Sequence, residues 1–186
     1  DDDRILGSPL KSRWSYSEAK AIDEILAYTY WREKGLETVI VRLFNTVGPR
    51  QTGSYGMVIP RFVTQALRGE PITVFGDGRQ TRCFCSVHDV VVGILALSEN
   101  SGAIGRVFNL GGTEEISMAD LAAKIVGLAG STSTIEYVPY DVAYEEGFED
   151  MERRVPDTTR AHELVGFAPT ASLDDIISAV IEDQRR

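Results

Sequence analysis

Residues 38–44, Thr-Val-Ile-Val-Arg-Leu-Phe, constrain the fold more than any other segment of this 186-residue chain. The run is short, almost continuously apolar and rich in β-branched residues, which favour strands. Such a strand is typical of a parallel sheet, because helices cover both faces of that kind of sheet. We therefore expect residues 38–44 to form a strand that is buried on both faces.

Predicted strands and helices alternate along the rest of the chain. Further strands are expected over residues 72–75, 107–110 and 135–138, and a helix over residues 60–67 that ends at Gly69. Ser117 is expected to cap one helix, and Ser172 with Asp175 another. Residues 140–152 are acidic and poor in aliphatic side chains, which indicates a solvated loop or lid. This alternation predicts the α/β class.

Two other helices are predicted with defined ends or faces. Ser15 and Glu18 form a capping box that would begin one helix, and Gly35 would end it. Ser86 and Asp89 would begin another helix. Its apolar spacing predicts an inward face made of Val90, Val91, Ile94 and Leu95.

Tyr16 and Lys20 are the first candidate functional residues. They lie four residues apart in a predicted helix, so both side chains are on one face. An ammonium group beside a phenol favours the phenolate, and the pair therefore suits the removal of a proton from a substrate hydroxyl. The spacing also arises by chance, and an ordinary surface pair is the alternative interpretation of these two residues alone.

Charge and cysteine content exclude several classes of function. The net charge of −9 argues against nucleic acid and against an anionic membrane surface as partners. The sequence contains no apolar run near the ~18 residues of a membrane span, and no signal peptide is visible. Cys83 and Cys85 have no Cys or His cluster around them, so we expect two reduced thiols, no metal site and a cytoplasmic protein.

Several motifs in a fixed order give the Tyr16/Lys20 pair its context. After the strand at 38–44 the chain continues as Asn-Thr-Val-Gly-Pro-Arg (45–50), Pro-Ile-Thr-Val-Phe-Gly-Asp-Gly (71–78), Gln-Thr-Arg-Cys-Phe (80–84), Val-His-Asp-Val (87–90), Val-Phe-Asn-Leu-Gly-Gly (107–112) and Arg-Arg-Val-Pro-Asp (153–157). In this order the segments resemble the extended short-chain dehydrogenase/reductase family. Within that family they are similar to the NAD-dependent nucleotide-sugar epimerases and dehydratases, of the UDP-glucose 4-epimerase kind. The resemblance covers essentially the whole chain.

This resemblance implies an α/β fold formed by the C-terminal part of a Rossmann-type domain and a small α/β substrate-binding domain. Residues 1–50 would end the NAD-binding Rossmann domain. Residues 51–186 would belong mainly to the nucleotide-sugar substrate domain, with Rossmann elements interleaved around residues 83–112. The Gly-rich dinucleotide loop of the family has no counterpart in this sequence, and the catalytic Ser or Thr of the family lies further upstream. We therefore expect this chain to be the C-terminal part of a longer enzyme and to be inactive alone.

The resemblance also implies roles on the cofactor side of the site. Tyr16 would be the catalytic base and would contact the cofactor. Lys20 would hold the nicotinamide ribose of NAD and assist the phenol. Phe44 and Thr46 would line the cofactor.

On the substrate side, the resemblance assigns Asn45, Arg82 and Arg154 to the diphosphate or sugar. Guanidinium forks suit that role, because they bind phosphate oxygens bidentately. Arg153 would replace Arg154 if the motif were shifted by one residue. The alternatives are a turn-forming Asn45 and arginines in surface ion pairs. His88 is expected to be structural.

The implied function is NAD-dependent modification of a nucleotide-diphosphate sugar, with a UDP-hexose 4-epimerase that oxidises C4 transiently as the leading reaction. A 4,6-dehydratase and a UDP-glucuronate decarboxylase are alternatives. The decarboxylases carry an arginine where this chain has Met57, and a thioether cannot supply the same charge. A regulatory or binding subunit that keeps the fold without turnover is the non-enzyme alternative. Members of the family usually form homodimers through the Tyr/Lys helix, for which the candidate outward residues are Ile25, Tyr28 and Trp31; packing of these side chains into the core is the alternative.

Overall fold

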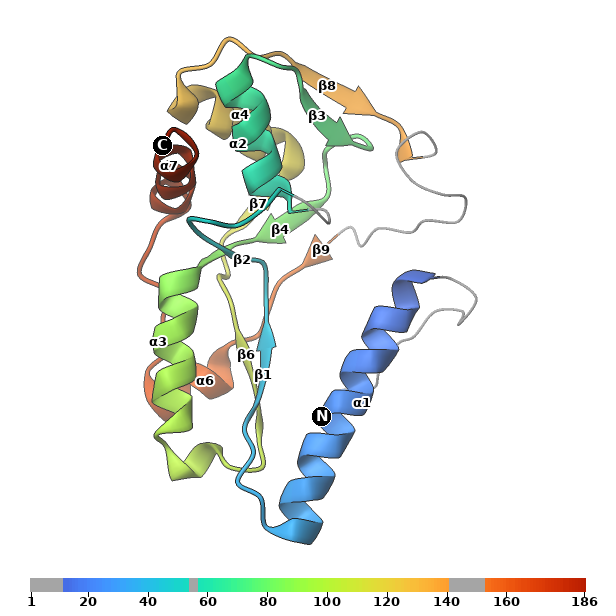
Figure 1. Ribbon diagram of the computed structural model, residues 1–186, viewed down its shortest axis with the longest axis vertical. Coiled ribbons are helices and arrows are strands. Elements are labelled where there is room, and N and C mark those ends of the chain that lie inside the picture. The colour runs from blue at the N-terminus through green and yellow to red at the C-terminus, as the bar shows by residue number, and fades with distance from the viewer. Residues whose placement is uncertain (1–11, 54–56, 141–152) are drawn as a thin grey trace.

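The computed structural model describes residues 12–53, 57–140 and 153–186 (Figure 1). Strands and helices alternate along the chain. In order they are α1 (Ser12–Lys34), β1 (Ile40–Leu43), β2 (Thr46–Val47), α2 (Val58–Arg68), β3 (Ile72–Phe75), β4 (Thr81–Cys83), β5 (Cys85–Ser86), α3 (Val87–Ser98), the short 3₁₀ helix η1 (Ser101–Ala103), β6 (Val107–Leu110), β7 (Glu115–Ser117), α4 (Met118–Ala129), β8 (Ile135–Val138), β9 (Arg153–Arg154), α6 (Thr159–Val165) and α7 (Leu173–Gln184).

Most of the strand pairing is parallel, which confirms the predicted α/β class. β1 pairs with β6, β2 with β5, and β3 with β8, all in parallel. The three-stranded sheet β7-β4-β9 is mixed, because β4 is antiparallel to β7 and parallel to β9. In Figure 1 the β7-β4-β9 sheet lies between an upper group of elements around β3 and β8 and a lower group around β1 and β6.

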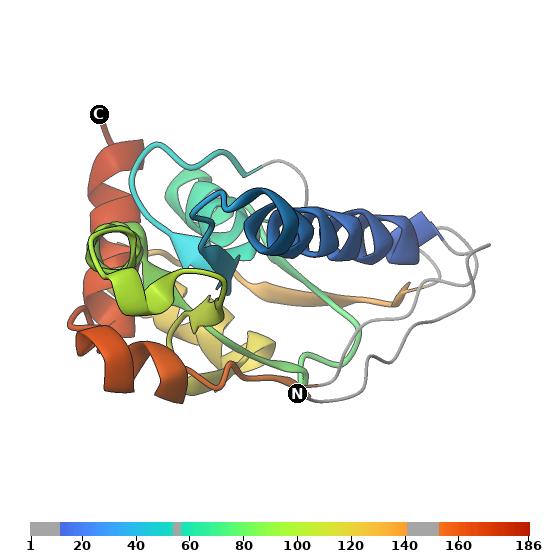
Figure 2. The same ribbon diagram turned by 90° about the horizontal axis from the view of Figure 1, so that it is seen from below.

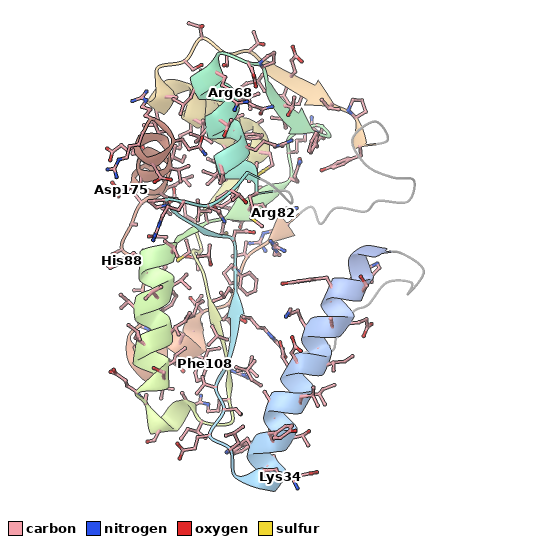
Figure 3. All side chains as sticks on the ribbon, in the orientation of Figure 1. Lys34, Arg68, Arg82, His88, Phe108 and Asp175 are labelled. Carbon is pink, nitrogen blue, oxygen red and sulfur yellow. The ribbon has the colours of Figure 1, made fainter. Side chains whose placement is uncertain are left out.

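Buried apolar side chains form two clusters that correspond to these two groups. The upper cluster joins α2, β3, α4 and α7, with Phe62, Ile72 and Ile177 fully buried in it. The lower cluster joins α3, β6 and α6, and Phe108 of β6 is fully buried in it. Figure 3 shows Phe108 on the lower strand pair, well separated from Arg68 on α2.

Several predicted elements are confirmed at their ends. The strands β3, β6 and β8 have the predicted bounds. α2 ends at Gly69, whose φ of 66° is in the left-handed region that glycine adopts without strain. The Ser117 hydroxyl caps α4, and Ser172 with Asp175 forms a complete capping box on α7.

The start of α1 differs from the prediction. The helix is already formed at Ser12, so Ser15 lies inside it and does not cap it. Local capping chemistry was therefore a poor guide, because nothing in residues 12–15 interrupts a helix. The predicted end is confirmed, since Gly35 has a φ of 68° and its N–H donates to the Trp31 carbonyl at 3.1 Å.

α1 lies beside β1 and is joined to it by polar contacts (Figures 1 and 2). The Arg42 guanidinium donates to both carboxylate oxygens of Glu24 at 2.7 and 2.6 Å, and the Thr38 hydroxyl donates to the Ala27 carbonyl. Near its C-terminal end the indole of Trp31 packs against Gly105, where an added Cβ would lie 2.4 Å from the ring. Trp31 is thus half-buried, which agrees with the packing alternative for this residue.

Two predicted burial patterns are wrong. β1 is not buried on both faces, because Arg42 and Leu43 are exposed and Leu43 retains 54% of its accessible surface. α3 buries Val90, Gly93 and Leu97, whereas three of the four residues predicted to face inward are exposed: Val91, Ile94 and Leu95. α3 is apolar all round, so its sequence period could not identify the buried face.

Candidate functional site

Asn45 occupies the sharp connection between β1 and β2. Its φ of 32° is a positive value that few residues other than glycine and asparagine adopt. The backbone carbonyl of Asn45 accepts from the Cys85 N–H, and its side-chain amide donates to the Cys83 carbonyl at 2.7 Å. These contacts fix the amide at the carboxyl end of β1, the end of a parallel strand where ligands bind in α/β proteins.

Arg82 and Arg154 lie side by side on neighbouring strands. They are register partners in the parallel pair β4–β9, so both side chains leave the same face of the sheet. The Arg154 guanidinium donates to the Asn45 side-chain oxygen, and the Arg82 guanidinium donates to the Thr81 carbonyl at 2.7 Å. The structure thus brings together the three residues predicted to bind substrate, Asn45, Arg82 and Arg154 (Figure 3 labels Arg82).

Arg153 is on the opposite face of β9 from Arg154. It forms a bidentate ion pair with Glu115 of β7, with Nη2 2.6 Å from Oε1 and Nε 3.1 Å from each oxygen. Because adjacent strand residues point to opposite faces, only Arg154 shares a face with Arg82. Sequence reasoning missed Glu115, which lies on β7, a strand that was not predicted, and no motif marks its position diagonal to Thr81.

Tyr16 and Lys20 lie in the amino-terminal half of α1. Tyr16 is 71% exposed, so its phenol is accessible. The Lys20 Nζ atom is 5.9 Å from the centre of the Tyr16 ring and 2.8 Å from the Asp23 carboxylate. The hydrogen bond and charge of Asp23 raise the pKa of Lys20, so the ammonium stays charged at neutral pH. The two side chains do share a helix face, as predicted.

Thr46 and Phe44 flank Asn45, so the two predicted cofactor-lining residues border the arginine cluster. The Thr46 hydroxyl oxygen is buried, and the part of the chain that the structure describes offers it no hydrogen-bond partner. A buried hydroxyl of this kind can accept or donate a bond to a bound polar molecule. Phe44 is half-buried, and its N–H donates to the Leu110 carbonyl at 2.9 Å.

Cys83 and Cys85 are free and buried. Burial, followed by the nearby charge of Asp89, raises the pKa of the Cys85 thiol to about 11. Burial and the Glu115 charge also raise the pKa of Cys83. Both sulfurs are therefore protonated at neutral pH. Within the described ranges no group of three or more His, Cys, Asp or Glu side chains could hold a metal ion.

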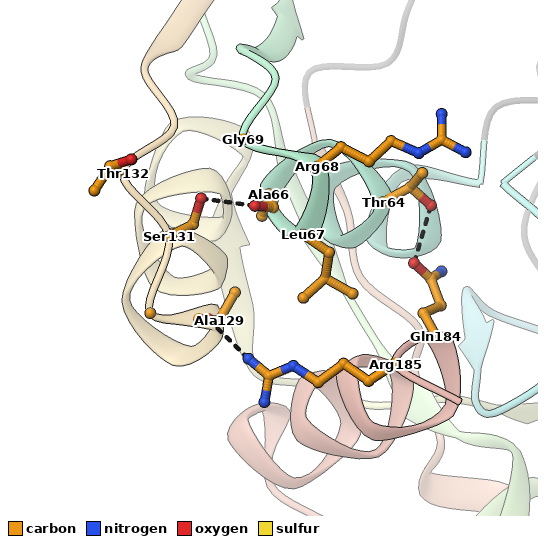
Figure 4. A pocket seen from close by; sticks show the side chains of 11 residues that line it. Thr64, Ala66, Leu67, Arg68, Gly69, Ala129, Ser131, Thr132, Gln184 and Arg185 are labelled. Atoms are coloured by element: carbon orange, nitrogen blue, oxygen red, sulfur yellow. Dashed lines mark hydrogen bonds between the residues drawn. The ribbon is translucent and has the colours of Figure 1, made fainter.

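The hollow drawn in Figure 4 is a different feature. It measures about 840 Å³ and lies at the C-terminal ends of α2, α4 and α7. Several of its polar lining groups bond to one another: Ser131 donates to the Ala66 carbonyl, Thr64 to Gln184, and Arg185 to the Ala129 carbonyl. None of the residues predicted to bind substrate or cofactor lines this hollow, so the arginine cluster is the better candidate for the predicted site.

Fold and site together define a mostly parallel α/β protein with a candidate phosphate-binding cluster beside the carboxyl end of β1. Residues 1–111 match the NAD dependent epimerase/dehydratase family, and the chain belongs to this family. The α/β fold implied by the sequence resemblance is thereby confirmed.

Curated relatives match almost the whole chain. It is 40% identical over 183 residues to the UDP-N-acetyl-alpha-D-glucosaminuronate decarboxylase of Bacillus cytotoxicus, covering 98% of this chain and 56% of the relative. It is 38% identical to UDP-glucuronic acid decarboxylase 1 of Arabidopsis thaliana, covering 96% of this chain and 39% of that protein. The chain thus spans about half the length of the curated relatives it matches.

Solved structures share the fold. The UDP-glucuronic acid 4-epimerase of Bacillus cereus in complex with NAD is similar with a TM-score of 0.81 and 29% identity, covering 98% of this chain and 55% of that one. The UDP-glucose 4-epimerase of Thermotoga maritima with UDP-glucose gives a TM-score of 0.82 and 28% identity, covering 99% of this chain and 59% of that one.

Among the described residues, no helix has the length and apolar character needed to cross a membrane.

Proposed function

We propose that the whole protein is a cytoplasmic enzyme that modifies a UDP-sugar by transient, NAD-dependent oxidation at C4. The main observation is the cluster of Arg82, Arg154 and Asn45. Two guanidinium groups lie on one face, next to an amide at the end of β1. This arrangement suits a diphosphate, because each guanidinium can bind the oxygens of one phosphate group. Membership of the NAD dependent epimerase/dehydratase family supports the cofactor.

Two of the predicted cofactor residues have the chemistry to contact NAD. Lys20 presents an ammonium that can donate to a ribose hydroxyl, and the buried Thr46 hydroxyl, for which the described residues offer no hydrogen-bond partner, can bond to a polar group of the cofactor. NAD, when bound, supplies the acceptor for the hydride that leaves C4. The backbone amides of a Gly-rich loop would hold its pyrophosphate, and this sequence contains no such loop.

Tyr16 would act on the sugar hydroxyl. Its exposed phenol oxygen can take the C4 hydroxyl proton as the C4 hydrogen leaves, and return a proton to the C4 oxygen in the reverse step. Lys20, charged and on the same helix face, stabilises the phenolate electrostatically. Asp23 holds the Lys20 ammonium at 2.8 Å, and it would have to share that ammonium with the cofactor and the phenol.

Epimerisation is the leading outcome, and decarboxylation is the second candidate. Met57 precedes α2 as its N-cap residue, and its sulfur accepts a hydrogen bond from Gln51. A thioether there cannot hold a sugar carboxylate by charge, which favours a neutral hexose. The curated relatives are decarboxylases of acidic nucleotide sugars, which favours an acidic sugar instead.

Product analysis separates these outcomes. The whole protein would be incubated with NAD and either UDP-glucose or UDP-glucuronate, and the products followed by proton NMR. A C4 epimer of UDP-glucose supports the leading reaction, whereas release of CO₂ from UDP-glucuronate supports the second. Tight UDP binding without turnover of either sugar would indicate a binding subunit. Absence of UDP binding would contradict the proposal as a whole.

A homodimer formed through α1 is also part of the proposal. Ile22, Ile25 and Leu26 on this helix are each at least half exposed. Contiguous exposed apolar side chains on one helix indicate an interaction surface. Sedimentation of the whole protein tests this: Ile25→Glu should shift a dimer toward monomer, and Glu33→Lys, which alters an exposed charge elsewhere on α1, should not.

A further inference from the structure

Glu115 is the residue outside the arginine cluster whose contacts bear most directly on it. Its carboxylate accepts from the Thr81 hydroxyl of β4 at 2.9 Å and from the Arg153 guanidinium of β9 at 2.6 to 3.1 Å. One side chain on β7 therefore connects both other strands of the β7-β4-β9 sheet. All three of these side chains lie on one face, opposite to the face of Arg82 and Arg154.

The strand β9 has few other attachments to β4. It contains only Arg153 and Arg154, and its register is Thr81 with Arg153 and Arg82 with Arg154. A ladder of two residue pairs specifies register weakly, and a slip of one residue would move each side chain to the other face. The bidentate contact of Arg153 with Glu115 requires the observed register, because only there does Arg153 share a face with Glu115.

We propose that Glu115 is a positioning residue, which holds β9 in register through Arg153 so that Arg154 lies beside Arg82 for a substrate diphosphate. This inference rests on the proposed binding of a UDP-sugar. Glu115 itself faces away from the diphosphate. The Arg153 guanidinium, with help from the Thr81 hydroxyl, holds the pKa of Glu115 below its ordinary value. The Glu115 carboxylate is therefore ionised throughout the neutral range.

The sign of the effect on binding distinguishes positioning from simple electrostatics. Removing a carboxylate near an anion site should tighten anion binding by Coulomb attraction alone. Positioning predicts the opposite: Glu115→Ala should weaken UDP binding by about tenfold, since Arg154 no longer forms its charge-assisted bond reliably. Glu136→Ala on β8 is the matched control, because it removes an exposed carboxylate from another sheet and should leave UDP affinity unchanged or slightly higher.

A double-mutant cycle in the whole protein tests whether Glu115 acts through Arg154. UDP affinity would be measured by calorimetry for Glu115→Ala, Arg154→Ala and the double variant. If Glu115 positions Arg154, then Glu115→Ala should change UDP affinity by less than about twofold in the Arg154→Ala background. An equal loss in both backgrounds, or no loss in the first, would overturn the inference. Glu115→Gln, which keeps an acceptor for Thr81 but lacks the charge for Arg153, gives the same test with less risk of misfolding.

Amide hydrogen exchange provides a second test of the positioning role that does not depend on UDP binding. In the ligand-free protein, amides of residues 153–158 should exchange faster in Glu115→Ala than in the unmutated chain, while those of β3 and β8 should not change. Unchanged exchange at residues 153–158 would overturn the positioning role. If the unmutated protein fails to bind UDP but the exchange difference is present, the proposed function is wrong and Glu115 still holds β9.

Discussion

Arg82 on β4 and Arg154 on β9 are direct partners in a parallel ladder, so two cationic side chains stand next to each other on one face. A bound phosphate could accept hydrogen bonds from both guanidinium groups at once, which is a physical reason to expect an anion there. Arg154 also donates to Asn45, so the pair is tied to the end of β1.

The arginine pair yields the first prediction. Arg82→Ala and Arg154→Ala should each weaken UDP binding to the whole protein by about 1.5–3 kcal/mol, the scale of a hydrogen bond to a charged group. Calorimetric titration with UDP measures this. The control is Arg79→Ala, which removes the same charge from the exposed turn after β3. Unaltered affinity in both cluster variants would show that these arginines only form surface contacts.

A second prediction concerns Tyr16. Tyr16→Phe should leave UDP affinity nearly intact and lower turnover by ~10²-fold or more, because only the proton-accepting oxygen is removed. Tyr30→Phe is the matched control, since Tyr30 is an exposed tyrosine further along the same helix. Steady-state kinetics with saturating UDP-sugar would compare the turnover of the two variants with that of the unmutated enzyme. Equal rates for Tyr16→Phe and the unmutated enzyme would remove Tyr16 from the mechanism.

The two thiols give a prediction about pH. With the Cys85 pKa raised to about 11 by burial, the thiolate should be scarce at pH 8. An aromatic disulfide reagent should therefore label neither Cys85 nor Cys83 in the folded protein within minutes, and should label both in denaturant. The folded-state pKa of Cys85 lies above the unfolded value of ~8.5. The contribution of this thiol to the free energy of unfolding is therefore fully present below pH ~8.5 and is lost as the pH rises toward 11. Rapid stoichiometric labelling of the native protein at pH 8 would contradict this.

Two glycines give opposite predictions for stability. A Cβ added at Gly112 would lie 2.1 Å from the Phe84 carbonyl oxygen, a backbone atom that cannot move aside. Gly112→Ala should therefore lower the free energy of unfolding by about 1–3 kcal/mol. Gly127 lies within α4 with no atom within 4 Å of the added group, so Gly127→Ala should raise it by about 0.5–1 kcal/mol. Denaturant unfolding of both variants provides the comparison, and destabilisation by Gly127→Ala would contradict the packing argument.

Sequence reasoning predicted elements well where a single local rule applied. The strand 107–110 and the helix after Ser172 had unambiguous patterns, and both formed as expected. The inward face of α3 could not be predicted, because apolar residues surround that helix and tertiary packing alone selects Val90 and Leu97. The exposure of Leu43 was missed for a related reason: a β-branched run shows that a segment is a strand, but not which neighbours cover it.

For the site, a resemblance placed Asn45, Arg82 and Arg154 in one group, and the structure shows them adjacent. Their roles, like those of Tyr16 and Lys20, and the division of the chain near residue 50, stay predictions. The contact of Arg153 with Glu115 could not be predicted, since it joins residues 38 positions apart through a register that no local pattern encodes.

Because β9 consists of two consecutive arginines, either register of this strand would place an arginine on the face that is proposed to bind the diphosphate. If β9 shifted by one residue, Arg153 would enter the binding face and Arg154 would leave it, so a phosphate would meet a guanidinium in either case. The side chains that tell the two arrangements apart are Glu115 and Asn45, one on each face. A change in the length of the chain before β9 could thus preserve the charge of the site while losing its geometry, and such a variant would still bind anions but would no longer align a sugar for reaction.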